Sequence, residues 1–242
     1  MIVNSHPQDA TSVKKYGLAL HTASRELGLA ISNFAGDSRC ETWNLDRDLA
    51  THLHQHLVEF IQPQTWADLA FIAVAKGPGG FTGTRMGMVT ARTLAQQLDI
   101  PVFAISTLAA FAWAQPPQSP LTKVNILELE PPQPPLAKGG LLKDDIALQM
   151  PTQRGQLFGA VYSVNKDSGL TELFPDTVMT AESWQEKLES WENSYQLIEV
   201  GSELGSSVSS VLELAYLEWQ QGSRPDWSDA LPYYGQHPVK GH

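Results

Sequence analysis

The sequence predicts an α/β protein built from two lobes, and three observations support this class. Three short strand-like stretches come first, and helical and strand-like segments then alternate in the order βββ-α-β-α-β-α. A proline-rich stretch interrupts this pattern near the middle of the chain, and a second series of strands and helices follows it. Alternation of this kind is typical of sheets covered by helices, and its repetition indicates two packed units.

Strand and helix periodicity places the first lobe at residues 16–107, after a flexible tail at residues 1–15. Apolar residues recur at the helical spacing in LATHLHQHLVEF, whereas LAFIAVA is a continuous apolar run of the kind found in strands covered on both faces. The expected elements are strands at 16–22, 27–34 and 39–45, a helix at 48–61, a strand at 69–75, a helix at 82–98 and a strand at 101–107.

The second lobe is predicted at residues 108–242 and includes a proline-rich insertion at residues 116–144. Seven of the 16 prolines fall between Pro116 and Pro135, which excludes a central strand or helix throughout that stretch. We expect a surface insertion in which residues 121–130 form one hairpin arm. The other expected elements are a helix at 108–114, strands at 145–150 and 156–164, a helix at 181–191, a strand at 195–201 and a helix at 206–221.

Composition limits the class of protein. The chain has 242 residues, of which 42% are hydrophobic and 17% charged, and this excludes a fibrous or globally disordered protein. The start is polar, and no apolar run approaches the roughly 18 residues that span a bilayer, so we expect a cytoplasmic protein with no membrane contact. The single cysteine, Cys40, allows no internal disulfide, and we expect it to be a buried thiol.

Charge is distributed unevenly along the chain, whose formal net charge is −10. Residues 167–229 contain thirteen acidic residues but only two basic ones, Lys187 and Arg224. This stretch would repel a phosphate backbone, and the other basic residues are scattered singly. If nucleic acid is a substrate, another component must therefore hold it.

A glycine-rich loop joins the predicted strand at 69–75 to the following helix. Its residues are Gly77, Pro78, Gly79, Gly80, Phe81, Thr82 and Gly83. Backbone amides before a helix can bind an anion, but glycines also allow a tight turn. The loop has neither the Gly-Lys-Ser/Thr end of a P-loop nor the GxGxxG spacing of a dinucleotide site, so the spacing favours the turn.

The helix after this loop carries a line of small residues at Gly83, Gly87, Ala91 and Ala95. Steps of four place them on one face, which another backbone can approach closely. Glycine inside a helix costs about 0.5–1 kcal/mol relative to alanine, so the line requires a packing partner. The partner is either an internal sheet or a helix of another chain.

Few residues are arranged for catalysis or metal binding. Asp48, His52 and His56 share one helix face, which makes a metal site conceivable, but no further ligand is evident and a polar or partner-facing side is favoured. The sequence contains no GxSxG elbow. Asp144 and Asp145 are expected to be solvated at the start of a strand. We therefore expect no catalytic residues, no metal and no cofactor.

The segment KGPGGFTGTRMG resembles the GPGSFTGxRxG motif of the TsaB (YeaZ) family, whose members are required to make threonylcarbamoyladenosine in tRNA. The resemblance covers about residues 16–115, through LHTAS, THLHQHLVEF, FIAVAKGPGG and GTRMGMVTARTLAQQLDIPVFAISTLAAFA. Weaker similarity is present in QRGQLFGAVYS and LPYYGQHPV. The insertion lies outside it.

This resemblance implies a two-lobed actin-like fold of the ASKHA, ribonuclease-H-like kind, with allowance for a degenerate second lobe. It implies a non-catalytic scaffold that activates N6-threonylcarbamoyladenosine modification of the anticodon-adjacent adenosine. The implied partners are the catalytic subunit TsaD and the ATPase TsaE, and tRNA would be contacted only through the complex. Alone, the chain would form a homodimer.

Departures from the family pattern bear on catalysis. The family's Asp-Thr-Ser position is His21-Thr22-Ala23 here, and Pro151 stands in the place of its second aspartate. The two metal-binding histidines of the catalytic relative would fall on Thr107 and Phe111. The alternative, an ASKHA-type small-molecule kinase or a glycopeptidase-like enzyme, would need such ligands.

The resemblance also implies a partner interface on the predicted helices at 48–61 and 82–98. The expected interface residues are Leu49, His52, Leu53, Met86, Gly87, Val89, Thr90, Ala91 and Thr93.

Overall fold

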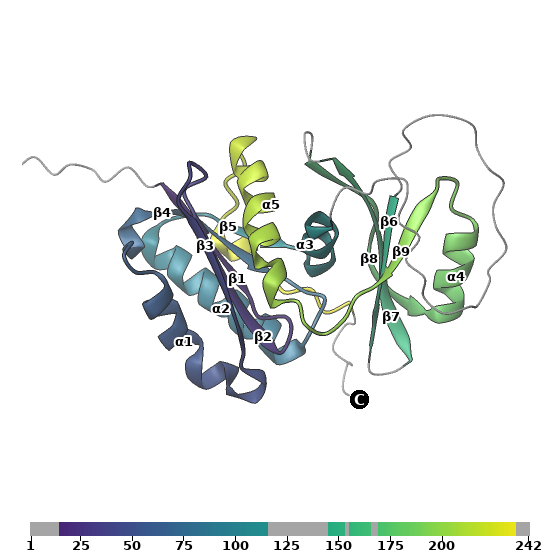
Figure 1. Ribbon diagram of the computed structural model, residues 1–242, viewed down its shortest axis with the longest axis horizontal. Coiled ribbons are helices and arrows are strands. Elements are labelled where there is room, and N and C mark those ends of the chain that lie inside the picture. Colours follow the sequence, from purple (N-terminus) through teal and green to yellow (C-terminus); the bar gives the residue numbers. More distant parts are fainter. Residues whose placement is uncertain (1–14, 116–144, 153–154, 166–168, 236–242) are drawn as a thin grey trace, which may run out of the picture.

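The computed structural model describes residues 15–115, 145–152, 155–165 and 169–235 (Figure 1). Its first half forms a five-stranded sheet in the order β3-β2-β1-β4-β5. The first three strands are antiparallel, whereas β4 and β5 run parallel to β1. The elements are β1 (Tyr16–His21), β2 (Glu26–Ser32), β3 (Ser38–Asn44), α1 (Leu49–Phe60), β4 (Leu69–Ala75), α2 (Phe81–Leu98), β5 (Val102–Ile105) and α3 (Thr107–Ala114).

The second half forms a four-stranded sheet in the order β8-β7-β6-β9. Again three antiparallel strands come first, and β9 then pairs parallel with the first of them. The second sheet therefore repeats the first, without a counterpart of β5 among the described residues. The elements are β6 (Asp145–Pro151), β7 (Gln156–Asn165), β8 (Gly169–Thr180), α4 (Ala181–Glu189), β9 (Tyr195–Glu199) and α5 (Val208–Gln220). Four short 3-10 turns are η1 (Asp46–Asp48), η2 (Trp66–Asp68), η3 (Gly205–Ser207) and η4 (Trp227–Asp229).

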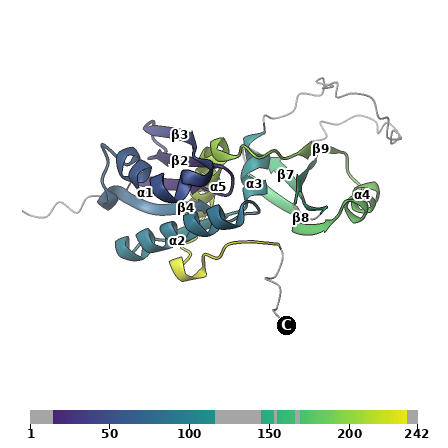
Figure 2. The ribbon, with the colours of Figure 1, turned by 90° about the horizontal axis from the view of Figure 1, so that it is seen from below.

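Helices and sheets alternate as layers across the molecule (Figures 1 and 2). α1 and α2 cover the outer face of the first sheet, and α4 covers the outer face of the second. α3 and α5 lie between the sheets and share one apolar core with both. α5 follows β9 in the chain, yet it packs on the first sheet, so the two halves exchange a helix. The two-lobed α/β class predicted from the sequence is confirmed.

Apolar patterning explains why these layers form. Leu49, Leu53, Leu57 and Phe60 are buried along one side of α1, as the helical spacing predicts. β4 is buried along nearly its whole length because α2 covers one of its faces and α5 the other. α3 begins at Ser106, whose Oγ accepts a hydrogen bond from the amide of Ala109 at 3.1 Å.

The sequence analysis missed β8. This strand is half-exposed at the edge of its sheet and contains Pro175, so it lacks the alternating apolar pattern of a buried strand. Its pairing with β7 shifts at two places, and at the first of them β8 has one extra residue, since Phe174 lies opposite Val161 and Thr177 opposite Gly159. The extra residue forms a bulge at Pro175 and Asp176, which changes the direction of the aspartate side chain.

Two further expectations were wrong. Cys40 is exposed, because β3 is the outermost strand of the first sheet and most of its side chains face solvent. Asp145 is 4% exposed rather than solvated, and its carboxylate accepts hydrogen bonds from Trp191 Nε1 and Asn193 Nδ2, both at 3.0 Å. Asp144, the insertion at residues 116–144 and the predicted tail up to residue 14 lie outside the described residues.

Candidate functional site

The glycine loop is a turn packed against the β1–β2 hairpin. The amide of Gly80 donates a hydrogen bond to the carbonyl oxygen of Ala23 at 2.7 Å. Gly77 has φ of +100°, and a Cβ there would overlap the carbonyl oxygen of Tyr233 in the C-terminal segment. The loop glycines thus serve a tight turn and close packing, and the Gly80 amide is already used within the chain.

The small-residue line of α2 packs against the chain's own first sheet. A Cβ at Gly83 would overlap the carbonyl oxygen of Thr22, and one at Gly87 would overlap its Oγ1. The Thr22 hydroxyl in turn donates a hydrogen bond to the Gly83 carbonyl at 2.8 Å. Ala91 and Ala95 are fully buried in the same core. Of the two partners considered for this line, the structure therefore contains the internal sheet.

The predicted interface residues divide into a buried and an accessible group. The buried ones, which support the chain's own core, are Leu49, Leu53, Gly87, Thr90 and Ala91. His52 and Met86 are half-buried, Thr93 is exposed and Val89 is 62% exposed. Only the second group is available to a partner of the folded chain.

We call the outward side of these two helices the α1–α2 face, and its residues are His52, Val58, Phe81, Arg85, Met86, Val89 and Thr93. Three large apolar side chains are exposed on it, namely Val58 (55%), Phe81 (56%) and Val89 (62%). The Arg85 guanidinium lies 5.1 Å from the centre of the Phe81 ring, and the centres of the Phe81 and Tyr234 rings lie 4.8 Å apart. Aromatic residues and arginine are enriched in protein interfaces, so the start of α2 has the composition of a docking surface. The sequence analysis had not included Tyr234, Arg85 or Val58.

The carboxyl ends of β1, β4 and β5 meet at one edge of the first sheet, since Leu20 pairs with Val74 and Ala75 with Ile105. Open α/β sheets commonly bind ligands at this edge. The residues directly after the three strands are Thr22, Lys76 and Ser106, and none is a carboxylate. Phosphoryl transfer needs carboxylates to hold a metal ion and direct water, and these strand ends do not supply them.

His21 ends β1 at this edge and is completely buried. Neither of its ring nitrogens has a hydrogen-bond partner among the described residues. Burial disfavours the charged imidazolium and lowers the pKa of His21 to about 4. The side chain is therefore neutral at physiological pH.

A buried polar cluster fills the space between this edge and the second sheet. The carboxylate of Asp176 accepts hydrogen bonds from Ser106 Oγ at 2.6 Å and from the Tyr162 hydroxyl at 2.7 Å. Tyr233 donates to the carbonyl oxygen of Asp176. Burial raises the pKa of Asp176, while the two hydroxyl donors oppose that shift. Because Asp176 is fully engaged in this way, it is held as a structural link between lobes. The sequence analysis missed it, together with the β8 bulge that directs it inward.

The α1 histidines are not gathered around a common point. His52 Nδ1 lies 3.1 Å from the carbonyl oxygen of Asp48, and the His56 ring packs on Trp43 with centroids 4.5 Å apart. His54 is exposed. Across the described part of the chain, no three His, Cys, Asp or Glu side chains are grouped closely enough to hold a metal ion.

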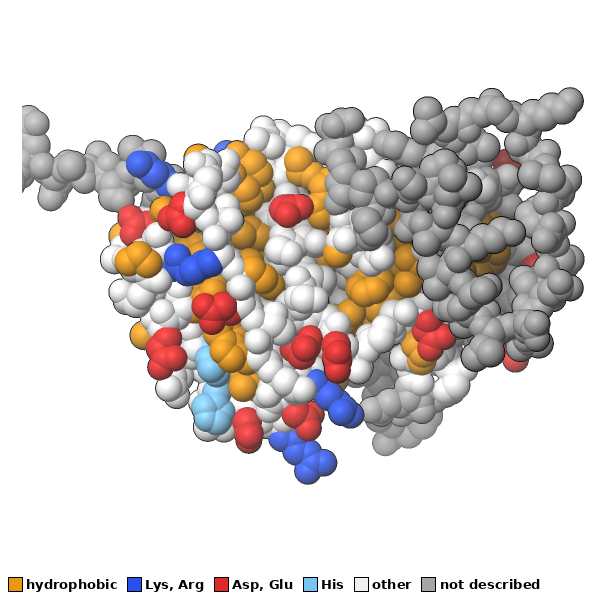
Figure 3. Space-filling view, viewed as in Figure 1, with side chains coloured by type: hydrophobic (Ala, Val, Ile, Leu, Met, Phe, Trp, Pro, Cys, Tyr) orange, Lys and Arg blue, Asp and Glu red, His pale blue; other side chains and the backbone are white. Residues whose placement is uncertain are grey.

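Charged side chains are dispersed over the face of the molecule in Figure 3. Acidic side chains outnumber basic ones there, and the lysines and arginines of the described residues form no dense patch on that face. No helix in the described ranges is both long enough and apolar enough to cross a bilayer.

Comparison with known proteins agrees with the resemblance identified from the sequence. Over 45 residues the chain is 56% identical to the tRNA threonylcarbamoyladenosine biosynthesis protein TsaB of Bacillus subtilis (strain 168). The matched stretch makes up 19% of this chain and 20% of that protein. Over 156 residues it is 25% identical to TsaB of Buchnera aphidicola subsp. Acyrthosiphon pisum (strain APS), or 64% of this chain and 61% of that protein. The chain thus aligns with less than two thirds of either relative. The family model described as "TsaD: tRNA N6-adenosine threonylcarbamoyltransferase" matches residues 53–124.

Solved structures show the same fold at greater coverage. A Pseudomonas aeruginosa protein described as similar to peptidase YEAZ superposes with a TM-score of 0.68 at 18% identity, covering 92% of this chain and all of that one. YeaZ from Pseudomonas aeruginosa gives a TM-score of 0.63 at 18% identity, covering 91% and 99%. The two-lobed actin-like fold predicted from the sequence is therefore confirmed.

Proposed function

We propose that this chain, which resembles TsaB proteins in sequence and YeaZ in fold, is a non-catalytic subunit for threonylcarbamoyladenosine biosynthesis in tRNA. It pairs with a TsaD-type transferase, and a TsaE-type ATPase joins the pair. The chain activates its partner by binding it, and the partner supplies the reacting groups. tRNA reaches the chain only through the complex.

The observation that carries this proposal is the α1–α2 face. Val89 and Phe81 expose more than half of their side chains at the surface of a well-packed helix layer. Exposed apolar residues about two turns apart on one helix, with an arginine beside an aromatic ring, favour association with another protein. Without TsaD, the same face would pair two copies of this chain.

The strand ends of the first sheet support the non-catalytic part of the proposal. The residues at these strand ends are the buried, neutral His21, the uncharged Thr22 and Ser106, and Lys76, so none of them is a carboxylate. The neighbouring Asp176 is already bonded to two hydroxyl groups. A kinase or hydrolase of this fold would need a carboxylate free to hold metal or activate water.

The charge of the second half supports an indirect role toward tRNA. The stretch at residues 167–229 carries thirteen acidic residues against two basic ones, and such an excess of negative charge repels a phosphate backbone. The partner would therefore contribute most of the affinity for tRNA.

A reconstitution with single components left out tests this function. The chain would be combined with TsaD and TsaE from the same cell, threonylcarbamoyl adenylate and tRNA, and the modified adenosine would be quantified by mass spectrometry. We expect modification only when this chain and TsaD are both present, and none with this chain alone. Modification by the isolated chain, or full modification without it, would contradict the proposal.

A further inference from the structure

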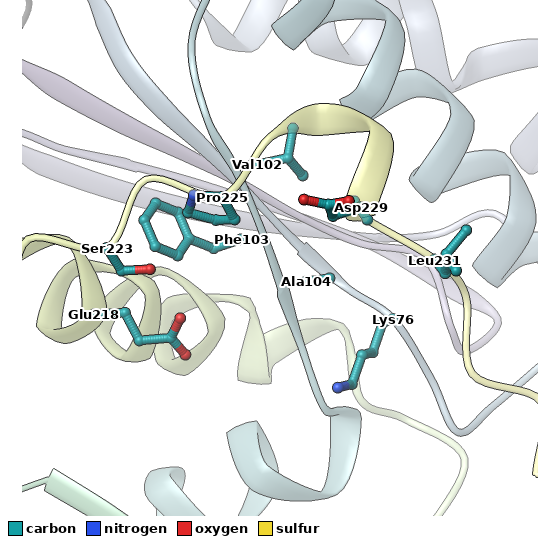
Figure 4. Close-up of a pocket in the computed structure, with 10 residues that line it drawn as sticks. Lys76, Val102, Phe103, Ala104, Glu218, Ser223, Pro225, Asp229 and Leu231 are labelled. Atoms are coloured by element: carbon teal, nitrogen blue, oxygen red, sulfur yellow. The ribbon is translucent and has the colours of Figure 1, made fainter.

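A cavity of about 380 Å³ lies beside β5, between α5 and the C-terminal segment (Figure 4). β5 is an edge strand of the first sheet, so one side of its main chain has no neighbouring strand. The amides of Ile72 and Lys76 donate to the carbonyl oxygens of Pro101 and Ile105, which fixes the side of β5 that faces β4. The N–H and C=O groups of Val102 and Ala104 consequently point away from β4.

The C-terminal segment covers the start of this free edge and then passes beside the residue that follows β4. Pro225 O accepts a hydrogen bond from the amide of Val102 at 3.3 Å, and the amide of Tyr233 donates to Lys76 O at 2.7 Å. Between these points, the segment turns outward through η4. Ala104 lines the cavity, and among the described residues its outward N–H and C=O have no hydrogen-bond partner. The main chain of Ala104 is therefore open toward the cavity.

Opposite charges face this opening without pairing. Lys76, Glu218 and Asp229 all line the cavity, together with the hydroxyl-bearing Ser223 (Figure 4). Within the described ranges, Lys76 forms no ion pair or side-chain hydrogen bond, although its positive charge also acts on the Asp176 carboxylate and lowers the pKa of that group. Burial raises the pKa of Glu218, and the positive charge of Lys76 opposes that shift, so the two groups influence one another across the cavity.

We propose that this cavity binds a free α-amino acid in its zwitterionic form. The ligand carboxylate pairs with the Lys76 ammonium and accepts a hydrogen bond from the Ala104 amide. The ligand ammonium pairs with Glu218 and Asp229 and donates to the Ala104 carbonyl. A single amino acid has the donor and acceptor of one strand residue, and these are complementary to the C=O and N–H of Ala104.

The charges of the cavity predict that neither a carboxylate group alone nor an ammonium group alone is enough for binding. A simple carboxylate would pair with Lys76 but would approach two carboxylates, whereas a simple amine would pair with those carboxylates but would bring a second positive charge near Lys76. A zwitterion meets both requirements at once. This inference is independent of the proposed function, since the cavity lies on the edge of the first sheet and not on the α1–α2 face.

Ligand-observed NMR on the full chain tests the site. Each proteinogenic L-amino acid would be offered at about 10 mM, a concentration that reveals dissociation constants near 1 mM. For every amino acid that binds, the N-acetyl derivative lacks the ammonium and the amide derivative lacks the carboxylate. We expect at least one amino acid to bind, and each of its two derivatives to bind at least about tenfold more weakly.

Two variants locate the binding. Lys76→Met and Glu218→Gln each remove one charge from the cavity, and both should weaken amino acid binding about tenfold or more. Lys15→Met and Glu203→Gln make the same changes at exposed positions elsewhere and should bind like the wild type, with thermal unfolding confirming that all four are folded. Absence of binding by every amino acid, equal binding of the derivatives, or unchanged affinity in both cavity variants would overturn the proposal.

Discussion

His21 combines complete burial with two ring nitrogens that have no hydrogen-bond partner among the described residues. A buried polar group of this kind costs stability, and its charged form costs more. The lowered pKa follows from this burial. An aspartate at this strand end would carry a charge, whereas His21 stays neutral.

This burial predicts a pH dependence of stability. The unfolded chain binds a proton at His21 near pH 6.5, whereas the folded chain does so only near pH 4, so stability contributed by the neutral side chain is lost as pH falls from 6.5 toward 4. Between about pH 7 and about pH 4.5 this amounts to roughly 2–3 kcal/mol. His21→Leu should remove that part of the loss, as measured by urea unfolding at both pH values. An equal loss in wild type and variant would refute the assignment.

Among the elements, α2 shows which features can be predicted from the sequence and which cannot. The turn, the small-residue line and the end of the helix at Leu98 were predicted correctly, because turn chemistry and side-chain size leave a clear pattern in the sequence. The helix begins one residue earlier than predicted, so Phe81, Thr82 and Gly83 belong to α2 and not to the loop. The identity of the packing partner was left open, since spacing alone does not distinguish a strand of the same chain from a helix of another. Contact of Gly83 and Gly87 with Thr22 shows that the partner is internal.

Close packing of α2 on Thr22 predicts the effect of adding one methyl group. Gly83→Ala gains helix propensity, but its Cβ would overlap the Thr22 carbonyl oxygen and the backbone would have to move. We expect the free energy of unfolding to fall by about 1–3 kcal/mol. Thr93→Ala, on the exposed side of the same helix, should change stability little. Unfolding in denaturant compares the two, and a Gly83→Ala variant as stable as the wild type would exclude the close contact.

β8, in contrast to α2, was not predicted from the sequence. Its place at the edge of the sheet leaves many side chains exposed, and Pro175 argues against a strand in any sequence-based assignment. The bulge arises from the pairing of β8 with β7, and the local sequence of β8 does not show that pairing. For the same reason the sequence could not show that Asp176 turns inward toward Ser106, 70 positions earlier in the chain.

In the whole molecule, α5 and the Asp176 cluster join the lobes. α5 follows the second sheet in the chain but packs on the first, while α3 packs between α5 and the second sheet. Asp176 links the second sheet to the start of α3 and to the C-terminal segment. The lobes are therefore coupled by one shared apolar core and one buried polar cluster.

Removing one acceptor oxygen of Asp176 should weaken this coupling. Asp176→Asn keeps the shape but replaces one of the two oxygens that accept from Ser106 and Tyr162 with an amide donor, and the loss of that hydrogen bond should lower the free energy of unfolding by about 1–3 kcal/mol. Glu203→Gln, an exposed change of the same kind, is the control. Amide hydrogen exchange at the start of α3 should also become faster in Asp176→Asn. Unchanged exchange and unchanged stability would show that the cluster does not join the lobes.

Pairing with TsaD through the α1–α2 face is the central claim, and one measurement tests it most directly. Val89→Asp places a charge on this face without disturbing the core, and Leu173→Asp makes a matched change at an exposed apolar residue of β8. Each purified variant would be mixed with TsaD from the same cell and analysed by size-exclusion chromatography with light scattering. We predict a heterodimer with the wild type and Leu173→Asp, and affinity at least about tenfold lower with Val89→Asp. A heterodimer of undiminished affinity with Val89→Asp, or no complex with the wild type, would contradict it.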